Sequence, residues 1–219
     1  MNKILSLLLL LLLLSISAIT QAFPVNSLRP GGVAIFNVLP ANQAKPEVTY
    51  KSSPIAVIKG QQNWLAIVGI GLNAKAGSHK ISIREQTGKV HTKSFRVKTH
   101  QYRTQRLSIK NQNKVNPNKH SSKRIEREYL LKQKLKKTFS ADQARLNFIR
   151  PVGGRDSGRF GLRRILNGQK RNPHSGMDIA APEGRKIKAT ESGRVIYVGD
   201  LFFSGRVVYI DHGLSLIHI

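Results

Sequence analysis

Residues 172–184 read NPHSGMDIAAPEG, and this stretch limits how the last third of the chain can fold. It holds two prolines and two glycines, which exclude a helix, because proline lacks an amide hydrogen and glycine weakens helices. Two strand-like runs follow at residues 193–199 and 205–210, and each begins with a glycine. We therefore predict that residues 148–219 form a β domain.

His174 and Asp178 are the residues of this stretch whose side chains could share a metal ion. An imidazole nitrogen and a carboxylate oxygen both suit zinc, whose ligand atoms lie about 2.0–2.2 Å from the metal. On a straight strand, residues four apart share a face but stand about 13 Å apart, so the chain would have to bend at Ser175-Gly176. The spacing alone favours two unrelated surface side chains, and a metal site stays the alternative at this point.

Residues 23–109 are predicted to form a separate N-terminal β domain, a small antiparallel sandwich. Its strand-like runs are separated by proline and glycine clusters at intervals of about ten residues, as in such sandwiches. The runs are residues 33–38, 48–51, 55–58, 64–70, 81–84 and 90–97. Trp64 is expected in the core of this domain. No catalytic constellation stands out, and the histidines are interpreted as surface residues: His79, His91 and His100.

Residues 110–147 are predicted to link the two β domains. Residues 110–121 are polar and rich in asparagine, which is typical of a loop, and Ser122 could cap a helix that runs to about Thr138. The apolar side chains of this helix fall on one stripe opposite a basic face. The stripe consists of Ile125, Tyr129, Leu131, Leu135 and Phe139. A connecting helix that packs this stripe on a domain is favoured, and a helix lying on a membrane surface is the alternative. The predicted fold class is therefore all-β with a helical linker.

The first 22 residues are interpreted as a cleaved secretory signal peptide. Lys3 gives a positive start, a leucine-rich core follows, and Ala22 ends a stretch of small residues. The alternative is a retained membrane anchor, but the apolar run of about 15 residues is shorter than the ~20 needed to span a bilayer. The mature protein is therefore expected to begin near Phe23 and to lie in the periplasm or cell envelope.

The chain has 219 residues and a formal net charge of +26, from 37 Lys and Arg against 11 Asp and Glu. The basic residues are spread along the whole mature chain, which favours binding to polyanions such as cell-wall polymers or an anionic membrane surface. Nucleic acid is disfavoured as a partner, because export separates the protein from it and no basic patch is interleaved with aromatic residues. The sequence has no cysteine, which excludes disulfides, zinc–thiolate sites and cysteine nucleophiles.

The last third of the chain resembles the lysostaphin/LytM-type zinc peptidases, which are endopeptidases that cut the peptide cross-links of peptidoglycan. The resemblance covers residues 148–213. It is carried by Phe160-Gly161 and by His174 and Asp178, with Pro182 and Gly184 in register. Residues 205–213 also carry it and end in Asp211-His212-Gly213. The earlier part looks, more loosely, like the β-rich N-terminal domain of one Gram-negative branch of this family. That impression rests on residues 64–70, 77–80 and 123–128.

The resemblance implies that His174 and Asp178 are ligands of one zinc ion. It also implies a third ligand from a later His-x-His motif, whose first histidine orients water together with another histidine. Neither motif occurs in the sequence: His212 matches a family position that is not a ligand, and His218 lies in a stretch unlike the family. We therefore expect no further catalytic residue within these 219 residues. We also expect the chain as given to be an inactive, C-terminally incomplete form whose gene continues.

The predicted function is that of an exported zinc metalloendopeptidase that hydrolyses peptide cross-links of peptidoglycan. In such a site zinc activates water and polarises the scissile carbonyl. A group of basic side chains could bind the carboxylates of stem peptides, although a solvated charged face is favoured: Arg159, Arg163, Arg164, Lys170 and Arg171. One alternative function is a non-catalytic member of the family that binds the wall or regulates an amidase. A second alternative is a basic exported wall- or membrane-binding protein without a metal.

Overall fold

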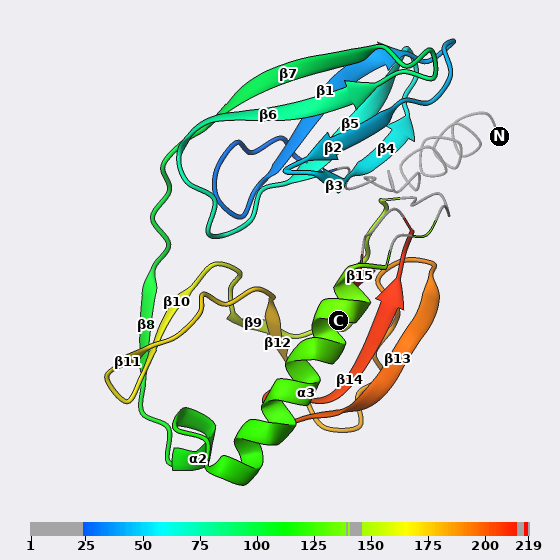
Figure 1. Ribbon diagram of the computed structural model, residues 1–219. Coiled ribbons are helices and arrows are strands. Elements are labelled where there is room, and N and C mark those ends of the chain that lie inside the picture. Colours follow the sequence, from blue (N-terminus) through cyan, green and yellow to red (C-terminus); the bar gives the residue numbers. More distant parts are fainter. Residues whose placement is uncertain (1–23, 139, 141–145, 214–216, 219) are drawn as a thin grey trace, which may run out of the picture.

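The computed structural model describes residues 24–138, 140, 146–213 and 217–218. Strands dominate these residues and are arranged in two parts. An extended segment joins the two parts, and a long helix lies within the second (Figure 1). The predicted all-β class is confirmed. The predicted signal peptide lies outside the described residues.

The N-terminal domain consists of two antiparallel sheets packed face to face. One sheet has the order β1-β5-β4, with β1 at Val33–Pro40, β5 at Asn63–Gly69 and β4 at Ala56–Lys59. The other has the order β3-β2-β6-β7, with β3 at Ser53–Pro54, β2 at Glu47–Tyr50, β6 at Gly77–Arg84 and β7 at Val90–Val97. The inward side chains of both sheets form one core, which matches the predicted sandwich. That core contains Ala34, Val48, Tyr50, Val57, Ala66, Val68, Ile70, Ile81, Ile83, Phe95 and Val97.

Two expectations about this domain need correction. Trp64 is half-buried at the edge of the core, where its indole N–H donates to the Gln43 carbonyl at 2.9 Å. His79 is not a surface residue, because it has the same strand parity as the buried Ile81 and Ile83 and turns inward with them. The other two histidines are also half-buried and have partners: His91 bonds Glu85, and His100 stacks edge-on against Tyr102.

The segment that leaves the sandwich joins the sheet of the C-terminal part. Strand β8, Thr104–Leu107, pairs in parallel with β10, Arg163–Leu166, and β10 also forms a hairpin with β11, Gln169–Lys170. The hairpin turn is Asn167-Gly168, and both residues have positive φ, as a two-residue turn of this kind requires. Residues 104–107 were grouped with the N-terminal domain from the sequence, whereas their hydrogen bonds lie in the C-terminal sheet.

Two helices follow, α2 at Gln112–Val115 and α3 at Lys119–Lys136. The α3 helix begins earlier than predicted, because the Asn118 side chain accepts a hydrogen bond from the Ser121 amide at 2.9 Å and so caps the helix in place of Ser122. Within the predicted apolar stripe Ile125, Leu131 and Leu135 are half-buried, Tyr129 is exposed, and Phe139 lies outside the described residues. Among the described residues, no helix is both long and apolar enough to cross a membrane.

The rest of the C-terminal part consists of short antiparallel pairings. Strand β9, Arg155–Gly158, pairs with β12, Asp178–Ala180, and β13, Arg194–Leu201, pairs with β14, Gly205–Asp211. A two-residue strand, β15 at Ile217–His218, extends the second of these sheets. The strand-like runs predicted from the sequence are therefore confirmed as β13 and β14.

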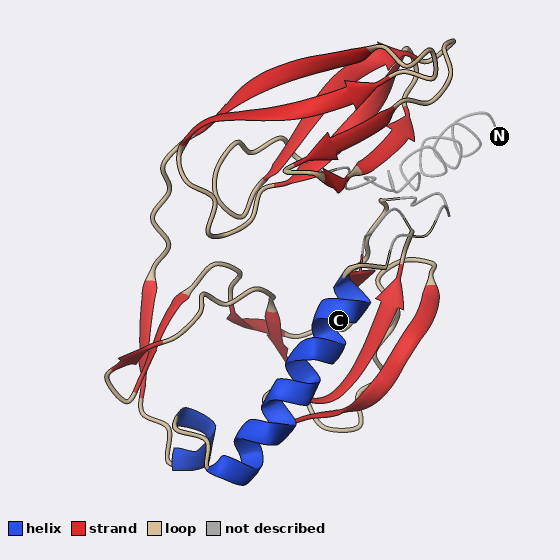
Figure 2. Cartoon of the chain, in the orientation of Figure 1, coloured by secondary structure: helices blue, strands red, loops and turns tan. Residues whose placement is uncertain are grey.

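Helix α3 lies beside the β13–β14 hairpin (Figure 2). The Glu128 carboxylate is nearly buried and accepts hydrogen bonds from the Phe202 amide at 2.9 and 3.1 Å. The Arg124 guanidinium bonds both Glu128 and the Asp200 carbonyl. These polar contacts attach the helix to the hairpin, which agrees with a connecting helix rather than a helix free to lie on a membrane.

Candidate metal centre

His174 and Asp178 converge, as a shared metal ion would require. Asp178 is the first residue of β12, and His174 lies in the loop before it. The bend in this loop brings His174 Nε2 to 3.1 Å from Asp178 Oδ1. Two donor atoms on one tetrahedral zinc ion, each about 2.1 Å from it, would stand roughly 3.4 Å apart. The observed separation is close to that value, so these two residues fit a common metal.

The backbone of His174 is fixed by two hydrogen bonds. Its N–H donates to the Leu162 carbonyl at 2.9 Å, and its own carbonyl accepts from the Gly161 amide at 2.7 Å. These two bonds fix the loop against the segment that enters β10. The imidazole is 13% exposed, and its Nε2 is buried without a well-aligned hydrogen bond to any described residue. A buried nitrogen in that position is suited to bind a metal.

The two carboxylate oxygens of Asp178 face different partners. Oδ1 faces His174, and Oδ2 lies 2.9 Å from a guanidinium nitrogen of Arg164. Asp178 pairs across the sheet with Gly158, where an added Cβ would stand 2.9 Å from the carboxylate carbon. The glycine therefore leaves room for the carboxylate, and the arginine fixes its orientation. Sequence reasoning had placed Arg164 among groove or surface cations and missed this contact.

The other predicted basic residues are more scattered. Arg171 donates to the Val115 carbonyl and to Gln169, so it holds the β10–β11 hairpin against α2. Arg159 and Lys170 are exposed, as a solvated face predicts. Arg163 lines a cavity between the two domains.

Within the described residues no cluster of three or more His, Cys, Asp or Glu side chains could hold a metal. The two donors at this site are therefore His174 and Asp178. His212 is buried elsewhere, with Nδ1 2.8 Å from the Ser192 carbonyl and its ring edge-on to Phe148. That packing agrees with a structural role for His212.

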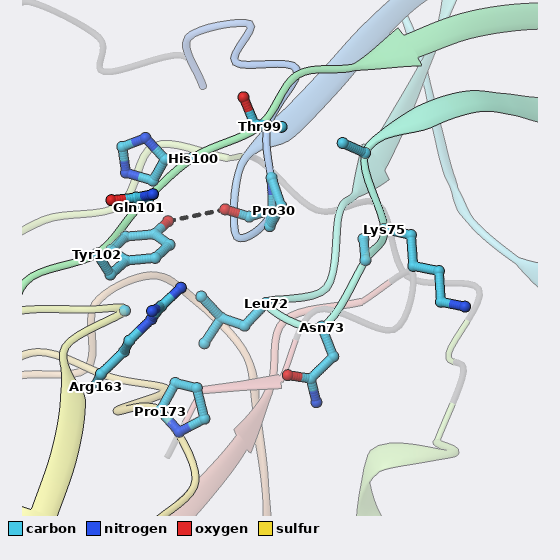
Figure 3. A pocket seen from close by; sticks show the side chains of 13 residues that line it. Pro30, Leu72, Asn73, Lys75, Thr99, His100, Gln101, Tyr102, Arg163 and Pro173 are labelled. Carbon is cyan, nitrogen blue, oxygen red and sulfur yellow. Dashed lines mark hydrogen bonds between the residues drawn. The ribbon is translucent and has the colours of Figure 1, made fainter.

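A cavity of about 470 Å³ lies between the N-terminal domain and the loop that carries His174 (Figure 3). Its wall includes Pro173, the residue immediately before His174. On the opposite side the Tyr102 hydroxyl donates to the Pro30 carbonyl at 2.9 Å. The full lining is Pro30, Leu72, Asn73, Ala74, Lys75, Ala76, Thr99, His100, Gln101, Tyr102, Gly161, Arg163 and Pro173. Both domains therefore contribute to this cavity, whose lining includes the neighbour of His174 in sequence but neither His174 nor Asp178.

Comparisons with known proteins agree with this geometry. Residues 26–100 match the peptidase family M23 N-terminal domain, and residues 172–219 match peptidase family M23 itself. No curated protein matches the chain. A crystal structure from Pseudomonas aeruginosa, described as a "putative peptidase M23", is 32% identical, with a TM-score of 0.70. The match covers 88% of this chain and 72% of that one. The chain therefore belongs to peptidase family M23, the LytM-type peptidases that its sequence resembles.

Proposed function

We propose that this peptidase is a zinc-dependent endopeptidase that acts on the peptide cross-links of peptidoglycan. The observation that carries the proposal is the approach of His174 Nε2 to Asp178 Oδ1, at 3.1 Å, within the segment that matches family M23. The buried His174 nitrogen and the oriented Asp178 carboxylate are the donor types that zinc takes in catalytic sites.

The residues of the site would act by holding and orienting. His174 would offer a neutral nitrogen, fixed by the backbone bonds to Leu162 and Gly161. Arg164 holds one oxygen of Asp178 and so leaves the other directed toward His174. Zinc bound there would supply Lewis-acid polarisation of the scissile carbonyl. The interdomain cavity, which is lined by Pro173 but by neither donor, would take part of an extended peptide whose backbone reaches His174.

Charge and the N-terminal sequence support a substrate in the cell wall. The net charge of +26 favours binding to a polyanionic polymer, and stem peptides carry free carboxylates. The leucine-rich first 22 residues support export to the periplasm, where peptidoglycan lies. An anionic membrane surface is a second proposed partner, because it carries negative charge as the cell-wall polymer does.

The proposal is tested by zinc binding and by digestion of purified sacculi. His174→Ala and Asp178→Ala should each weaken zinc binding by at least about tenfold in a competition titration, because each removes one of the two donors. In a form of the protein that releases muropeptides, both variants should stop the chelator-sensitive release. His120→Ala, an exposed histidine on α3, is the matched control and should change neither readout. Chelator-sensitive digestion that survives in His174→Ala refutes the proposed site.

A second candidate is a member of the family that binds the wall without cutting it. It is kept because a catalytic zinc site usually has three protein ligands, whereas the described residues bring two together. We accordingly expect residues 1–219 alone to bind zinc weakly and to release no muropeptides. Binding to sacculi with no release of muropeptides at saturating zinc, even in a chain extended beyond residue 219, would favour this second candidate.

A further inference from the structure

A second cavity, of about 520 Å³, lies on the N-terminal domain between β2, β6 and the loop before β6. Its lining consists of Tyr50, Lys51, Asn73, Lys75, Ser78, His79 and Lys80. Three of these residues carry ammonium groups, and none carries a carboxylate. We propose that this cavity is an anion subsite that binds the free carboxylates of the peptide substrate, a proposal that rests on the proposed function.

The floor of the cavity is built from mutually bonded groups, of which Tyr50 is buried and His79 is half-buried. His79 Nε2 lies 2.8 Å from the Lys75 carbonyl, which can only accept, so this nitrogen carries the proton. In the neutral ring Nδ1 is then the acceptor for the Tyr50 hydroxyl at 2.6 Å. Burial raises the pKa of Tyr50, which keeps its hydroxyl protonated and able to donate. The loop that carries Lys75 is thereby fixed to the sandwich.

The cations around this floor have no acidic partner. Lys51 lies in a turn with φ of +50°, and its ammonium stands over the Tyr50 ring at 5.5 Å. No described Asp or Glu forms an ion pair with Lys51, Lys75 or Lys80. Like charges that share one cavity repel each other, and a bound carboxylate relieves that repulsion.

This cavity is continuous in its lining with the interdomain cavity beside the metal centre. Asn73 and Lys75 line both cavities. In Figure 3 the Arg163 guanidinium points into the interdomain cavity, whereas the Lys75 side chain extends away from it. The two cavities therefore meet at Asn73 and Lys75, and the interdomain cavity contains a further cation, Arg163. A peptide that carries carboxylates could lie along the two cavities with its backbone near His174.

The test is an NMR titration of the His79 ring and the surrounding amides in the full chain. The probes are acetyl-D-alanyl-D-alanine, its C-terminal amide and inorganic phosphate. The test variant replaces Lys51, Lys75 and Lys80 with glutamine. The control variant replaces three exposed α3 lysines with glutamine and removes the same charge: Lys123, Lys134 and Lys136. Lys80→Glu gives the same test with a single exposed substitution.

We expect the test variant to bind the carboxylate peptide about tenfold more weakly, since three exposed ion pairs contribute modestly each. The control variant should change affinity by less than about twofold, and the amide probe should bind weakly to every protein. Equal weakening in both variants, or equal binding of peptide and amide, would overturn the proposal. Binding of phosphate without binding of the carboxylate peptide would also overturn the proposal. The cavity would then be a site for a phosphate-bearing polymer or head group.

The readout separates this proposal from the proposed function, because it measures binding and needs no hydrolysis. In a form of the protein that releases muropeptides, His174→Ala should abolish that release, and it should leave the binding of the carboxylate peptide unchanged. If the lysine variant binds normally while His174→Ala stops hydrolysis, the subsite alone is wrong. If His174→Ala still hydrolyses while the lysine variant loses binding, the proposed zinc site alone is wrong.

Discussion

Replacing Gly161 with alanine should weaken the junction between the two domains. Gly161 has φ of +83°, and a Cβ there would stand 2.6 Å from Cζ of the Tyr102 ring and closer still to its edge. The ring packs against this glycine while its hydroxyl binds the Pro30 carbonyl. A methyl group would therefore force the ring out of its position.

The cost can be estimated from two terms. An alanine in the left-handed region costs about 1–2 kcal/mol. Displacing Tyr102 loses a hydrogen bond worth about 1 kcal/mol and a half-buried ring contact worth about 1 kcal/mol more. The sum is about 3–4 kcal/mol, which for a chain of this size lowers the melting temperature by roughly 10 °C.

Gly168→Ala is the matched control for this experiment. Gly168 has nearly the same φ, +79°, but no atom lies within 4 Å of the Cβ it would gain. Gly168→Ala should therefore lower the free energy of unfolding in urea by only the cost of an alanine in the left-handed region, about 1–2 kcal/mol. In a Tyr102→Ala background Gly161→Ala should also fall to that smaller cost. If Gly161→Ala and Gly168→Ala destabilise the protein equally, the Tyr102 contact does not hold the junction.

Three further predictions concern other parts of the chain. Glu128→Ala should cost about 2–3 kcal/mol in urea unfolding, because the nearly buried carboxylate accepts from the amide of the β13–β14 turn, whereas the exposed Glu126→Ala should be neutral. The hydrogen bond from His91 lowers the pKa of Glu85. Ionised Glu85 therefore stabilises the folded chain fully above the ordinary glutamate pKa, and this stabilisation is lost as the pH falls through the lowered pKa. His91→Ala should raise the pKa of Glu85 in an NMR titration, and an unchanged value would contradict this. If the first 22 residues are a cleaved signal peptide, as we propose, N-terminal sequencing of the protein from its native host should begin near Phe23, and a retained first residue would refute the proposal.

The parts of the fold that the sequence predicted are those with local causes. Proline and glycine clusters separate the strands of the sandwich, and glycines flank β13 and β14, so the strand runs could be read directly. The pairing of His174 with Asp178 was predicted from the family resemblance, because their spacing alone favours two unrelated surface side chains. In the structure a short loop bends them into contact.

The missed features depend on pairings between distant segments. Strand β8 is short and polar, and nothing in its sequence shows that it pairs in parallel with β10, almost sixty residues away. Arg164 cannot be distinguished from its neighbour Arg163 by type or by flanking residues. The register of β10 gives one arginine to Asp178 and the other to the interdomain cavity. His79 was missed for another reason: its parity with Ile81 was visible, but its polarity was given more weight.

The junction and the metal centre share one residue. The Gly161 amide donates to the His174 carbonyl, and the open face of the same glycine receives the Tyr102 ring. Tyr102 in turn is bonded to Pro30 of the N-terminal domain. A shift of the N-terminal domain that moves this ring therefore acts on the backbone that holds His174, the proposed metal ligand. An alanine at Gly161 would displace the Tyr102 ring and would also strain the backbone at φ of +83°. The amide of the same residue bonds the His174 carbonyl, so the substitution should alter both the junction and the placement of His174.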